Sequence, residues 1–511
     1  MIFQNVKNLQ NNDDKRYFKE KIDIYIKIVD ALCKNSSIQL CRVEEKDYFE
    51  KMREMGIIDN IDELDYLKQV LSKNRFNEFI CAVSAEVIYP DLISPHVQNL
   101  NNTYRKKAQE EEKNRNAFTL VDLFCGAGGL SLGFKQCGFK TIFGNDFERL
   151  CIETYTYNHP EIPTDRVVCG DIRKIAECIT TYIPEEVDIV IGGPPCQGFS
   201  SANKHHRVID DPRNELYKYF IKAVEQLAPK VVVMENVKGM LKVANQVVED
   251  YENIKIQRGD VTYSYSVAYS ILLSSEFSVA QSRERLIYIA LRNDIVQSRH
   301  ITPKGVFSII RNNNKKNIHY NLSDALEGVR GLIAPHIMGV GEVDNDESGR
   351  KIDINPYLGN ENGYLRLINQ DRTIPFVYNH KARYCSELNQ EIYRRMEQGD
   401  DATDPKIADI MPYAHRNDKF KDKYFRLYGD RPCRTITAHL RSDCHSHIHP
   451  YEDRAITPRE AARVQSFPDD YLFLGPYLKA YIQIGNAVPV VMARGIASVI
   501  KKVLEGEDYE D

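Results

Sequence analysis

One cysteine stands in a Gly/Pro-rich segment, where its thiol could act as a nucleophile. Cys196 follows the Gly-Gly-Pro-Pro segment 192–195, which itself comes directly after the apolar run 187–191. An apolar run of this kind predicts a buried strand, and the prolines predict that it ends in a rigid, solvent-facing loop. Structural cysteines more often lie inside apolar runs, as small hydrophobic residues. The position therefore favours a nucleophile, and an inert loop cysteine is the alternative if nothing lowers the pKa of the thiol.

Carboxyl and guanidinium groups next to other apolar runs could complete a reactive site with this thiol. Glu235 comes directly after the apolar run 231–234, at the predicted end of a central strand, where partial desolvation would favour the protonated acid. Arg283 and Arg285 precede the apolar run 286–291, and a spacing of two places them on one side of an extended backbone. There they could bind a phosphate or a base oxygen. The alternatives are a surface position next to a helix start for Glu235 and a solvated strand entry for the arginines.

A glycine-rich turn after the apolar strand 118–124 predicts a nucleoside-binding site. Gly126, Gly128 and Gly129 would let a ligand approach the backbone, and the helix that follows would offer free N–H groups. A tight connection between a strand and a helix is the alternative reason for such glycines. Because no lysine followed by serine or threonine comes directly after the last of them, a nucleoside without a triphosphate fits better than ATP.

Acidic residues at the ends of the next strands support a nucleoside site. The predicted strand 140–145 is followed by Asp146 and Phe147. Nucleoside-binding α/β proteins bind ribose hydroxyls with an acidic residue at this point, and the phenyl ring could stack on adenine. A third short strand, 167–172, ends in another aspartate, Asp171.

These segments, taken in order, resemble the DNA (cytosine-5)-methyltransferase family of the prokaryotic restriction-modification type. The resemblance covers about residues 117–500 and leaves the N-terminal part outside. An ordered set of blocks is far more specific than any one of them. The blocks that carry it are 122–129, 192–197, 235–237, 281–285, 454–471 and 483–489.

The resemblance implies S-adenosyl-L-methionine (SAM) as the cofactor and carbon 5 of cytosine as the methyl acceptor. Carbon 5 is a poor nucleophile, and Cys196 would activate it by adding its thiolate to carbon 6. Glu235, protonated or sharing a proton, would stabilise ring nitrogen 3, and Arg285 would lie at oxygen 2. Arg283 would steady that loop or bind a nearby phosphate. Because the target carbon lies inside the duplex stack, the base would have to rotate out into the pocket.

The resemblance also implies a set of cofactor-binding residues. They would hold the methionine part and the adenosine at the glycine turn, the ribose at Asp146 and the adenine at Phe147. The family commonly has tryptophan at the position of Phe147, and this chain contains no tryptophan, so we expect a smaller stacking face. The full set is Phe124, Gly126, Gly128, Gly129, Asp146, Phe147, Asp171, Ile172, Pro194, Leu216, Asn486 and Val488.

The predicted fold is an α/β, Rossmann-like SAM-dependent methyltransferase core with a smaller target-recognition domain and a helical N-terminal extension. Periodic apolar residues predict helices in 1–116, without indicating their role. Residues 117–294 would form the catalytic core, 295–453 the target-recognition domain, and 454–511 would return to the core. The charged run 105–113 predicts a solvated helix or a linker in front of the catalytic part.

Basic and aromatic residues alternate in one stretch of the predicted recognition domain, as contacts to phosphates and base edges require. Any single charge there could equally belong to a solvated face. The basic residues are Arg416, Lys419, Lys421, Lys423, Arg426, Arg431, Arg434 and Arg441. The aromatic residues among them are Tyr413, Phe420, Tyr424, Phe425 and Tyr428.

A cluster of potential metal ligands follows this stretch. In an extended segment, His445, His447 and His449 could share one side, with Cys444 next to them. Structural zinc sites draw ligands from two segments, and no second pair here has zinc-like spacing. We therefore expect no metal, and a strand or loop that leads into the block at Arg454.

Composition limits the class of protein. The chain has 511 residues, and its 12 cysteines include no Cys-x-x-Cys pair and follow no signal peptide, which favours free thiols in a reducing cytoplasm. No apolar run approaches the ~20 residues that cross a membrane. With a net charge of −5, the whole chain is not a basic coat for DNA, so DNA affinity would need a local positive surface. We expect a cytoplasmic, nucleoid-associated monomer.

The expected partner is double-stranded DNA, with a separate restriction endonuclease as a further partner in the cell. Two other functions stay open at this point. A tRNA cytosine-5 methyltransferase would share the core, although the Gln197–Ser200 continuation and the long segment 295–453 favour DNA. A DNA-binding protein with a decayed methylase core is the other alternative, and four intact residues argue against it: Cys196, Glu235, Arg283 and Arg285.

Overall fold

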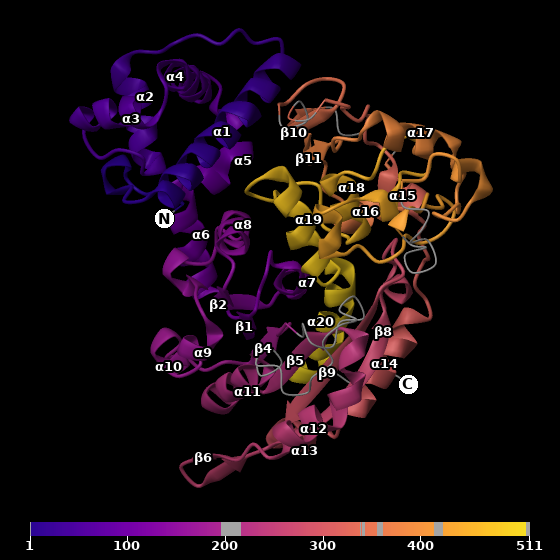
Figure 1. Cartoon of the computed structure of the whole chain (residues 1–511). Helices are drawn as coiled ribbons and strands as arrows, with labels where there is room; N and C mark the ends of the chain where they lie inside the picture. The colour runs from indigo at the N-terminus through magenta and orange to yellow at the C-terminus, as the bar shows by residue number, and fades with distance from the viewer. Residues whose placement is uncertain are drawn as a thin grey trace.

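A seven-stranded sheet forms the centre of the larger part of the molecule (Figure 1). The computed structural model describes residues 2–195, 216–337, 339, 343–354, 361–412 and 423–506. The strand order is β3-β2-β1-β4-β5-β9-β8. The strands are β1 (Thr119–Leu123), β2 (Lys140–Asp146), β3 (Val167–Cys169), β4 (Ile189–Gly192), β5 (Val231–Asn236), β8 (Tyr265–Leu273) and β9 (Glu284–Arg292).

The direction of the strands decides where the polar residues gather. β1 to β5 run parallel, whereas β9 runs antiparallel to both β5 and β8. β4 and β5 are buried along their whole length, as expected for parallel strands covered on both faces. Because parallel strands end at the same edge, the residues that follow β1, β2, β4 and β5 meet there. The predicted α/β core is confirmed.

One face of the sheet carries helices that lie between the parallel strands in sequence or follow the last of them. Val121, Val190 and Val232 point to this face, because alternate residues of a strand face opposite sides. The helices packed there are α9 (Ile172–Ile175), α10 (Ile179–Tyr182), α11 (Leu216–Leu227) and α12 (Ala244–Glu252).

The other face carries the helix between β1 and β2 together with helices from later parts of the chain. Leu120 and Val231 point to it, next in sequence to residues of the first face. The helices are α7 (Gly129–Gln136), α13 (Asn293–Arg299), α14 (Pro303–Asn314) and α20 (Val490–Glu505). α7 and α20 pack so closely that a Cβ on Gly133 would lie 2.5 Å from the Ala493 Cβ. α14 follows residue 294, the predicted end of the catalytic core, and still packs on the sheet.

The smaller part of the molecule follows α14 and consists largely of short helices and loops. Figure 1 shows it in orange to yellow above the sheet. It contains a two-stranded sheet, in which β10 (Gly349–Ile354) pairs antiparallel to β11 (Phe376–Lys381). Its helices are α15 (Leu322–Leu326), α16 (Gly363–Asn369), α17 (Glu387–Arg395), α18 (Pro458–Val464) and α19 (Tyr477–Asn486).

The N-terminal region is helical, as predicted, and it packs against both other parts. Its apolar core continues into Tyr157 of the sheet domain, into Ile352 of β10 and Phe376 of β11, and into Leu472. None of the helices in the described ranges is long and apolar enough to cross a membrane. The N-terminal helices are α1 (Asn12–Asn35), α2 (Glu45–Met55), α3 (Leu64–Val70), α4 (Lys73–Ile88), α5 (Pro90–Val97) and α6 (Asn102–Asn114).

The charged run 105–113 differs in part from its prediction. It lies in α6 and is helical, but Arg105 is only 1% exposed rather than solvated. Its guanidinium donates hydrogen bonds to the carbonyl oxygens of Thr156 and His159, at 2.9 and 3.4 Å. These carbonyls lie at the C-terminal end of α8 (Arg149–Asn158), where helix carbonyls lack partners within the helix and accept from a cation.

Candidate active site

The segment that leads to the predicted nucleophile is held at the end of β5. Cys196 and residues 197–215 lie outside the described residues, but Gly193 to Pro195 are described. The Asn236 amide donates a hydrogen bond of 2.9 Å to the Pro194 carbonyl oxygen. A Cβ on Gly193 would lie 2.8 Å from Glu235 Oε2, so a residue without a side chain lets the segment pass this close to the carboxylate. The segment that precedes Cys196 in sequence therefore passes beside Glu235.

Glu235 and Arg285 form an ion pair at this edge. Arg285 Nε lies 2.6 Å from Glu235 Oε1 across the antiparallel pairing of β5 and β9. The Arg285 side chain is 13% exposed and the Glu235 side chain 11%, so the pair is largely buried but keeps some accessible surface. Burial lowers the pKa of Arg285, and the Glu235 carboxylate opposes that shift. Glu235 is thus no surface residue beside a helix start, and a base that enters here would meet an acid and a guanidinium together.

Arg283 points into the protein instead of into a solvated cleft. Its side chain has no exposed surface, and burial holds its pKa well below the usual value. The guanidinium donates hydrogen bonds to the carbonyl oxygens of Ile436, Gly485 and Ala487, at 2.5, 2.9 and 3.1 Å. These contacts support the expectation that Arg283 steadies the loop, and they leave its guanidinium no access to a phosphate.

Gln281 reinforces the same junction. Its side chain donates a hydrogen bond to Gln465 Oε1 at 2.7 Å and accepts one from the Ile436 N–H at 2.8 Å. The Ser282 N–H donates to the Cys433 carbonyl oxygen at 2.7 Å. The segment 281–285 therefore ties the sheet to the region around residue 436 and to the C-terminal blocks.

The glycines of the turn after β1 have different reasons to be glycine. A Cβ on Gly126 would meet no described atom within 4 Å, so this position is open to a ligand. At Gly128 a Cβ would lie 2.7 Å from the Tyr471 hydroxyl, and at Gly129 it would lie 2.6 Å from the Val488 carbonyl oxygen. The open backbone predicted for ligand approach is thus found at Gly126, whereas Gly128 and Gly129 admit the C-terminal blocks.

The end of β2 brings the predicted ribose-binding acid to this turn. Asp146 accepts a hydrogen bond from the Gly126 N–H at 2.9 Å and from the Glu148 N–H at 2.8 Å. Burial raises the pKa of Asp146, and these backbone donors oppose the shift. Phe147 is 70% exposed and offers a free aromatic face next to the acid. Phe124 adopts a left-handed backbone (φ 58°), a strained conformation that is common at ligand sites.

The remaining predicted cofactor residues divide between the same edge and the core. Asp171 caps α9 by accepting from the Arg173 N–H at 3.0 Å, and it also pairs with the Arg173 guanidinium. Ile172 is buried in the core beneath the sheet, against which Leu216 also packs. Asn486 lies exposed at the end of α19, and Val488 is buried with its carbonyl beside Gly129. An open glycine, an acid and an exposed aromatic ring together fit a nucleoside cofactor.

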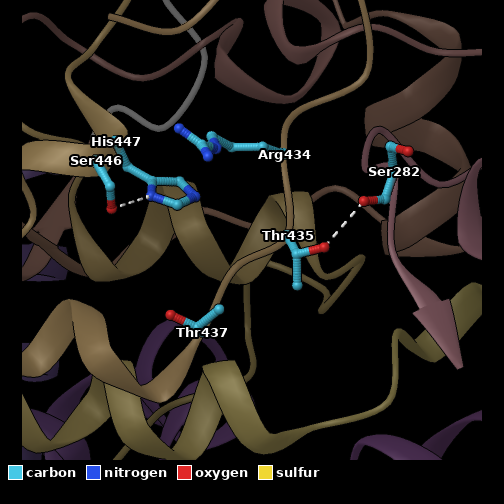
Figure 2. Close-up of a pocket in the computed structure, with 6 residues that line it drawn as sticks. All are labelled: Ser282, Arg434, Thr435, Thr437, Ser446 and His447. Carbon is cyan, nitrogen blue, oxygen red and sulfur yellow. Dashed lines mark hydrogen bonds between the residues drawn. The ribbon is translucent and has the colours of Figure 1, made fainter. Parts of the chain in front are cut away.

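A pocket of about 430 Å³ opens where the segment 281–285 meets the smaller part of the molecule (Figure 2). The Thr435 hydroxyl donates to the Ser282 carbonyl oxygen at 3.0 Å, and Ser446 Oγ lies 2.9 Å from His447 Nδ1. Burial lowers the pKa of His447 to about 3, so its ring is neutral at physiological pH. The pocket is lined by Ser282, Arg434, Thr435, Thr437, Ser446 and His447. Hydroxyl groups, one arginine and no carboxylate make it suited to an anion.

No local pattern in the sequence connects these pocket residues. Arg434 is predicted only as one charge in a basic stretch and His447 only as a possible metal ligand, and Thr435 and Thr437 belong to no predicted site. Ser282 lies far from them in sequence, and nothing local to either segment indicates that they meet. The signal would have to be a contact prediction between the two segments.

The basic and aromatic stretch is only partly described, because Arg416, Lys419, Lys421, Tyr413 and Phe420 lie outside the described residues. Arg426 is buried and donates hydrogen bonds to the carbonyl oxygens of Tyr393 and Met396, at 2.6 and 3.0 Å. Arg431 instead is exposed and lies 3.7 Å from the centre of the Tyr428 ring. The stretch thus contains both structural and accessible cations.

The histidines after this stretch have separate partners. His445 stacks on Tyr424 with ring centres 4.5 Å apart, and His445 Nδ1 lies 2.6 Å from the Tyr393 hydroxyl. His449 Nδ1 accepts from the N–H groups of Tyr451 and Glu452, at 3.2 and 3.0 Å. His445 to His447 form a 3₁₀ turn, so the segment is not extended there. Within the described ranges, no three His, Cys, Asp or Glu residues are placed to hold a metal ion.

Comparisons with known proteins agree with this arrangement. A family model described as C-5 cytosine-specific DNA methylase matches residues 118–502. The type II methyltransferase M.AgeI of Thalassovita gelatinovora is 30% identical over 433 residues, which cover 75% of this chain and 98% of the relative. The type II methyltransferase M.DdeI of Desulfomicrobium norvegicum is 30% identical over 412 residues, covering 76% of this chain and 89% of the relative. A solved E. coli structure, described as a prophage-encoded DNA modification methyltransferase, shares the fold with a TM-score of 0.56 at 24% identity, over 76% of this chain and 100% of that one.

Proposed function

The chain belongs to the C-5 cytosine-specific DNA methylase family, and from this premise we propose that it methylates carbon 5 of one cytosine within a specific sequence of duplex DNA. The observation that carries the proposal is the meeting of Glu235, Arg285 and the Gly193–Pro195 segment at the end of the parallel strands. This meeting point is next to the glycine turn, because β4 pairs with β1. When bound, SAM supplies an electrophilic methyl group on a sulfonium.

The Cys196 thiolate attacks the ring. The sulfur forms a bond to carbon 6 of cytosine, and the electron pair of the 5,6 double bond shifts into the ring towards nitrogen 3 and oxygen 2. Carbon 5 thereby becomes nucleophilic enough to accept a methyl group. Water then takes up the carbon 5 proton, the electron pair of that C–H bond re-forms the 5,6 double bond, and the Cys196 sulfur leaves as a thiolate. The position of the preceding segment supports this role, because Gly193 and Pro194 are held against Glu235 and Asn236.

Glu235 and Arg285 stabilise the charge that this attack creates. When it holds a proton, Glu235 would donate a hydrogen bond or that proton at nitrogen 3, and the Arg285 guanidinium would donate at oxygen 2. The contact of 2.6 Å between Arg285 Nε and Glu235 Oε1 orients both groups before a base arrives. Arg283 touches no reacting atom in this scheme. As a positioning residue, it holds the start of β9 against the segments that contain Ile436 and Gly485.

Cofactor binding falls to the edge formed by the turn after β1 and by the end of β2. Gly126 leaves its backbone open, Asp146 would bind the ribose, and Phe147 would stack on the adenine. Asn486 and Val488, from the end of α19 and the loop after it, would hold the methionine part. Pro194 would contact the cofactor from the nucleophile's side. The exposure of Phe147 supports its role, since a buried ring could not stack on a ligand.

DNA would be held between the sheet domain and the smaller part of the molecule, which serves as the target-recognition domain. The pocket lined by Ser282, Arg434 and Thr435 supports this placement, because it offers anion-binding groups at the junction of the two. A phosphate of the strand that carries the target base fits this chemistry. The target base itself must leave the duplex stack to reach Glu235.

Methyl transfer to different nucleic acids tests the proposed function. Purified protein with labelled SAM should methylate duplex DNA that contains its site and should leave tRNA unlabelled. Bisulfite sequencing of DNA from cells that express the protein should then show one modified cytosine in a constant context. Labelled tRNA with unlabelled DNA would establish the tRNA methyltransferase alternative, and binding of DNA without any transfer would establish the decayed methylase.

The relatives' names as type II methyltransferases support a place in a restriction-modification system. In that role the protein would modify the site that a separate endonuclease cleaves, and it would act as a monomer on DNA in the cytoplasm, at the nucleoid. Size-exclusion chromatography with light scattering measures the oligomeric state. Protection of methylated DNA from nuclease digestion in an extract of the source cells would reveal the endonuclease.

A further inference from the structure

α8 connects the proposed cofactor site to the rest of the protein. It begins at Arg149, directly after Asp146 and Phe147, and the Glu148 N–H donates to Asp146 at 2.8 Å. In its last turns, Tyr155 packs under the glycine turn, since a Cβ on Gly128 would lie 3.0 Å from the Tyr155 ring. A shift of α8 would therefore move the acid, the aromatic ring and the turn together.

The N-terminal helix α1 holds α8 through a group of alternating charges. The Arg16 guanidinium lies 2.6 and 2.5 Å from the two carboxylate oxygens of Glu153, and Glu153 also pairs with Arg149 at 3.0 Å. Arg149 in turn pairs with Asp14 of α1 at 2.8 Å, which lowers the pKa of Asp14. The Glu153 side chain is only 4% exposed, so loss of Arg16 would leave a nearly buried carboxylate with one partner fewer.

The same face of α1 contacts the two-stranded sheet β10–β11 and the C-terminal part of the chain. Glu20 lies 2.5 Å from the Lys351 amine of β10 and accepts a hydrogen bond of 2.7 Å from the Gly475 N–H. Arg16 joins Glu20 at 3.1 Å, so one row of charges runs from β10 through α1 to α8. Lys27 adds an ion pair of 2.6 Å with Asp344, in front of β10.

The apolar contacts show that this docking is extensive. Tyr157 of α8 and Phe376 of β11 both lie in the apolar core of the N-terminal helices. The family match begins only at residue 118, so this support is added to the part that the family shares. An added domain that merely linked to the core would leave α8 exposed, whereas here α1 covers it.

We propose that the N-terminal domain is a brace for the cofactor site, and that Arg16 is a positioning residue that fixes α8 and, through it, Asp146 and Phe147. This inference rests on the cofactor roles proposed for those two residues. It predicts that the first 116 residues are required for tight cofactor binding, even though they contain none of the residues that contact the cofactor. Arg16 acts through α8 and not on the ligand.

The full-length protein with Arg16→Met tests the brace. The change keeps an unbranched, flexible apolar stem and removes the charged guanidinium. Calorimetric titration with S-adenosylhomocysteine should show binding weakened about tenfold, which corresponds to ~1.4 kcal/mol, and the KM for SAM should rise with it while kcat at saturation stays near wild type. Arg16→Lys keeps the charge but lacks the two separate nitrogens that bind Glu153 and Glu20, so it should fall between the wild type and Arg16→Met. Lys34→Met is the matched control, because it removes an exposed pair with Asp30 from the same helix.

Two further readings keep the outcome decisive. If Arg16→Met lowers the unfolding temperature but leaves the Kd for S-adenosylhomocysteine within about twofold of wild type, the role is merely structural and the brace is overturned. If Arg16→Met does not fold, the same two measurements are made on Arg16→Lys: weaker binding of S-adenosylhomocysteine supports the brace, and unchanged binding overturns it. Asp146→Ala separates this from the proposed function: it should abolish cofactor binding, and unchanged binding in that variant would show that the cofactor site itself lies elsewhere.

Discussion

Arg285 and Glu235 at the end of the parallel strands keep 13% and 11% of their side chains exposed, whereas Arg463 and Asp469 in the C-terminal blocks keep none. Both are arginine–carboxylate pairs of similar length: Arg285 Nε lies 2.6 Å from Glu235 Oε1, and Arg463 Nε lies 2.7 Å from Asp469 Oδ1. The second pair is also surrounded by protein partners. Asp469 accepts from the Asn369 amide at 3.1 Å, and Arg463 donates to the Glu327 carbonyl oxygen at 2.6 Å.

The difference separates a pair that can act on a ligand from a pair that holds the fold. A fully enclosed pair has no free side from which a substrate could approach, and it resists change because removal of one partner leaves a buried charge. A pair with one accessible side can exchange its mutual contact for contacts to a substrate. The residue types are much the same in both pairs, an arginine with a carboxylate, so substitution experiments are needed to distinguish their roles.

The largest effect is expected at the nucleophile, beside the accessible pair. Cys196→Ser should abolish methyl transfer while DNA binding persists, because the thiolate makes the covalent bond and affinity comes from phosphate and base contacts elsewhere. Steady-state rates and a DNA-binding titration measure the two properties. DNA with 5-fluorocytosine at the target should trap a covalent complex with the wild type only. Turnover within about tenfold of wild type would remove Cys196 from the chemistry.

The enclosed pair should respond in stability. Arg463→Met leaves the buried Asp469 carboxylate unpaired and should cost about 3–5 kcal/mol in the free energy of unfolding. Denaturant unfolding measures it. Arg372→Met is the control, because its pair with the neighbouring Asp470 is 50% and 37% exposed, and such pairs contribute only about 0–1 kcal/mol. Equal losses in the two variants would mean that enclosure does not set the strength of these pairs.

The accessible pair should respond in rate. Glu235→Gln should slow methyl transfer on the order of 10²-fold or more, because an amide donates a hydrogen bond but cannot transfer a proton as an acid does. Some activity should survive, unlike in Cys196→Ser. Single-turnover kinetics on duplex DNA measures the step. Glu284→Gln, at an exposed carboxylate that pairs with Lys238, should leave the rate unchanged. A Glu235 variant as fast as wild type would contradict the proposed role.

The smallest effect is expected in the pocket between the two parts of the molecule. Arg434→Met should weaken DNA binding several-fold for all sequences and should lower the salt dependence of binding by about one ion, because one phosphate contact is lost. Binding titrations over a range of salt concentrations measure the slope. Arg53→Met removes an exposed cation of the N-terminal domain and serves as the charge-matched control. An unchanged slope in Arg434→Met would place the phosphate elsewhere.

The sequence predicts the fold and the edge of the sheet well, for a physical reason. Apolar runs identify buried strands, and parallel strands end at one edge, so Asp146 and Glu235 could be placed there from their position after such runs alone. The linear order of the sequence blocks further identifies the family. Arg283 and Arg285 show what a local pattern cannot predict. Their spacing predicts a shared side, yet Arg283 turns inward to carbonyl oxygens of Ile436 and Gly485, which are distant in sequence.

By itself, the sequence determined the family, through the linear order of its motifs, and it indicated candidate residues for the chemistry, because both depend on residue type and local pattern. Only the tertiary structure decided which polar groups stay accessible. Gly128 is glycine because Tyr471 lies against it, and Gly126 leaves its backbone open to a ligand. The docking of α1 on α8 and β10 likewise comes from complementary charges such as Arg16 and Glu153. Such contacts join segments far apart in the chain, and no local pattern records them.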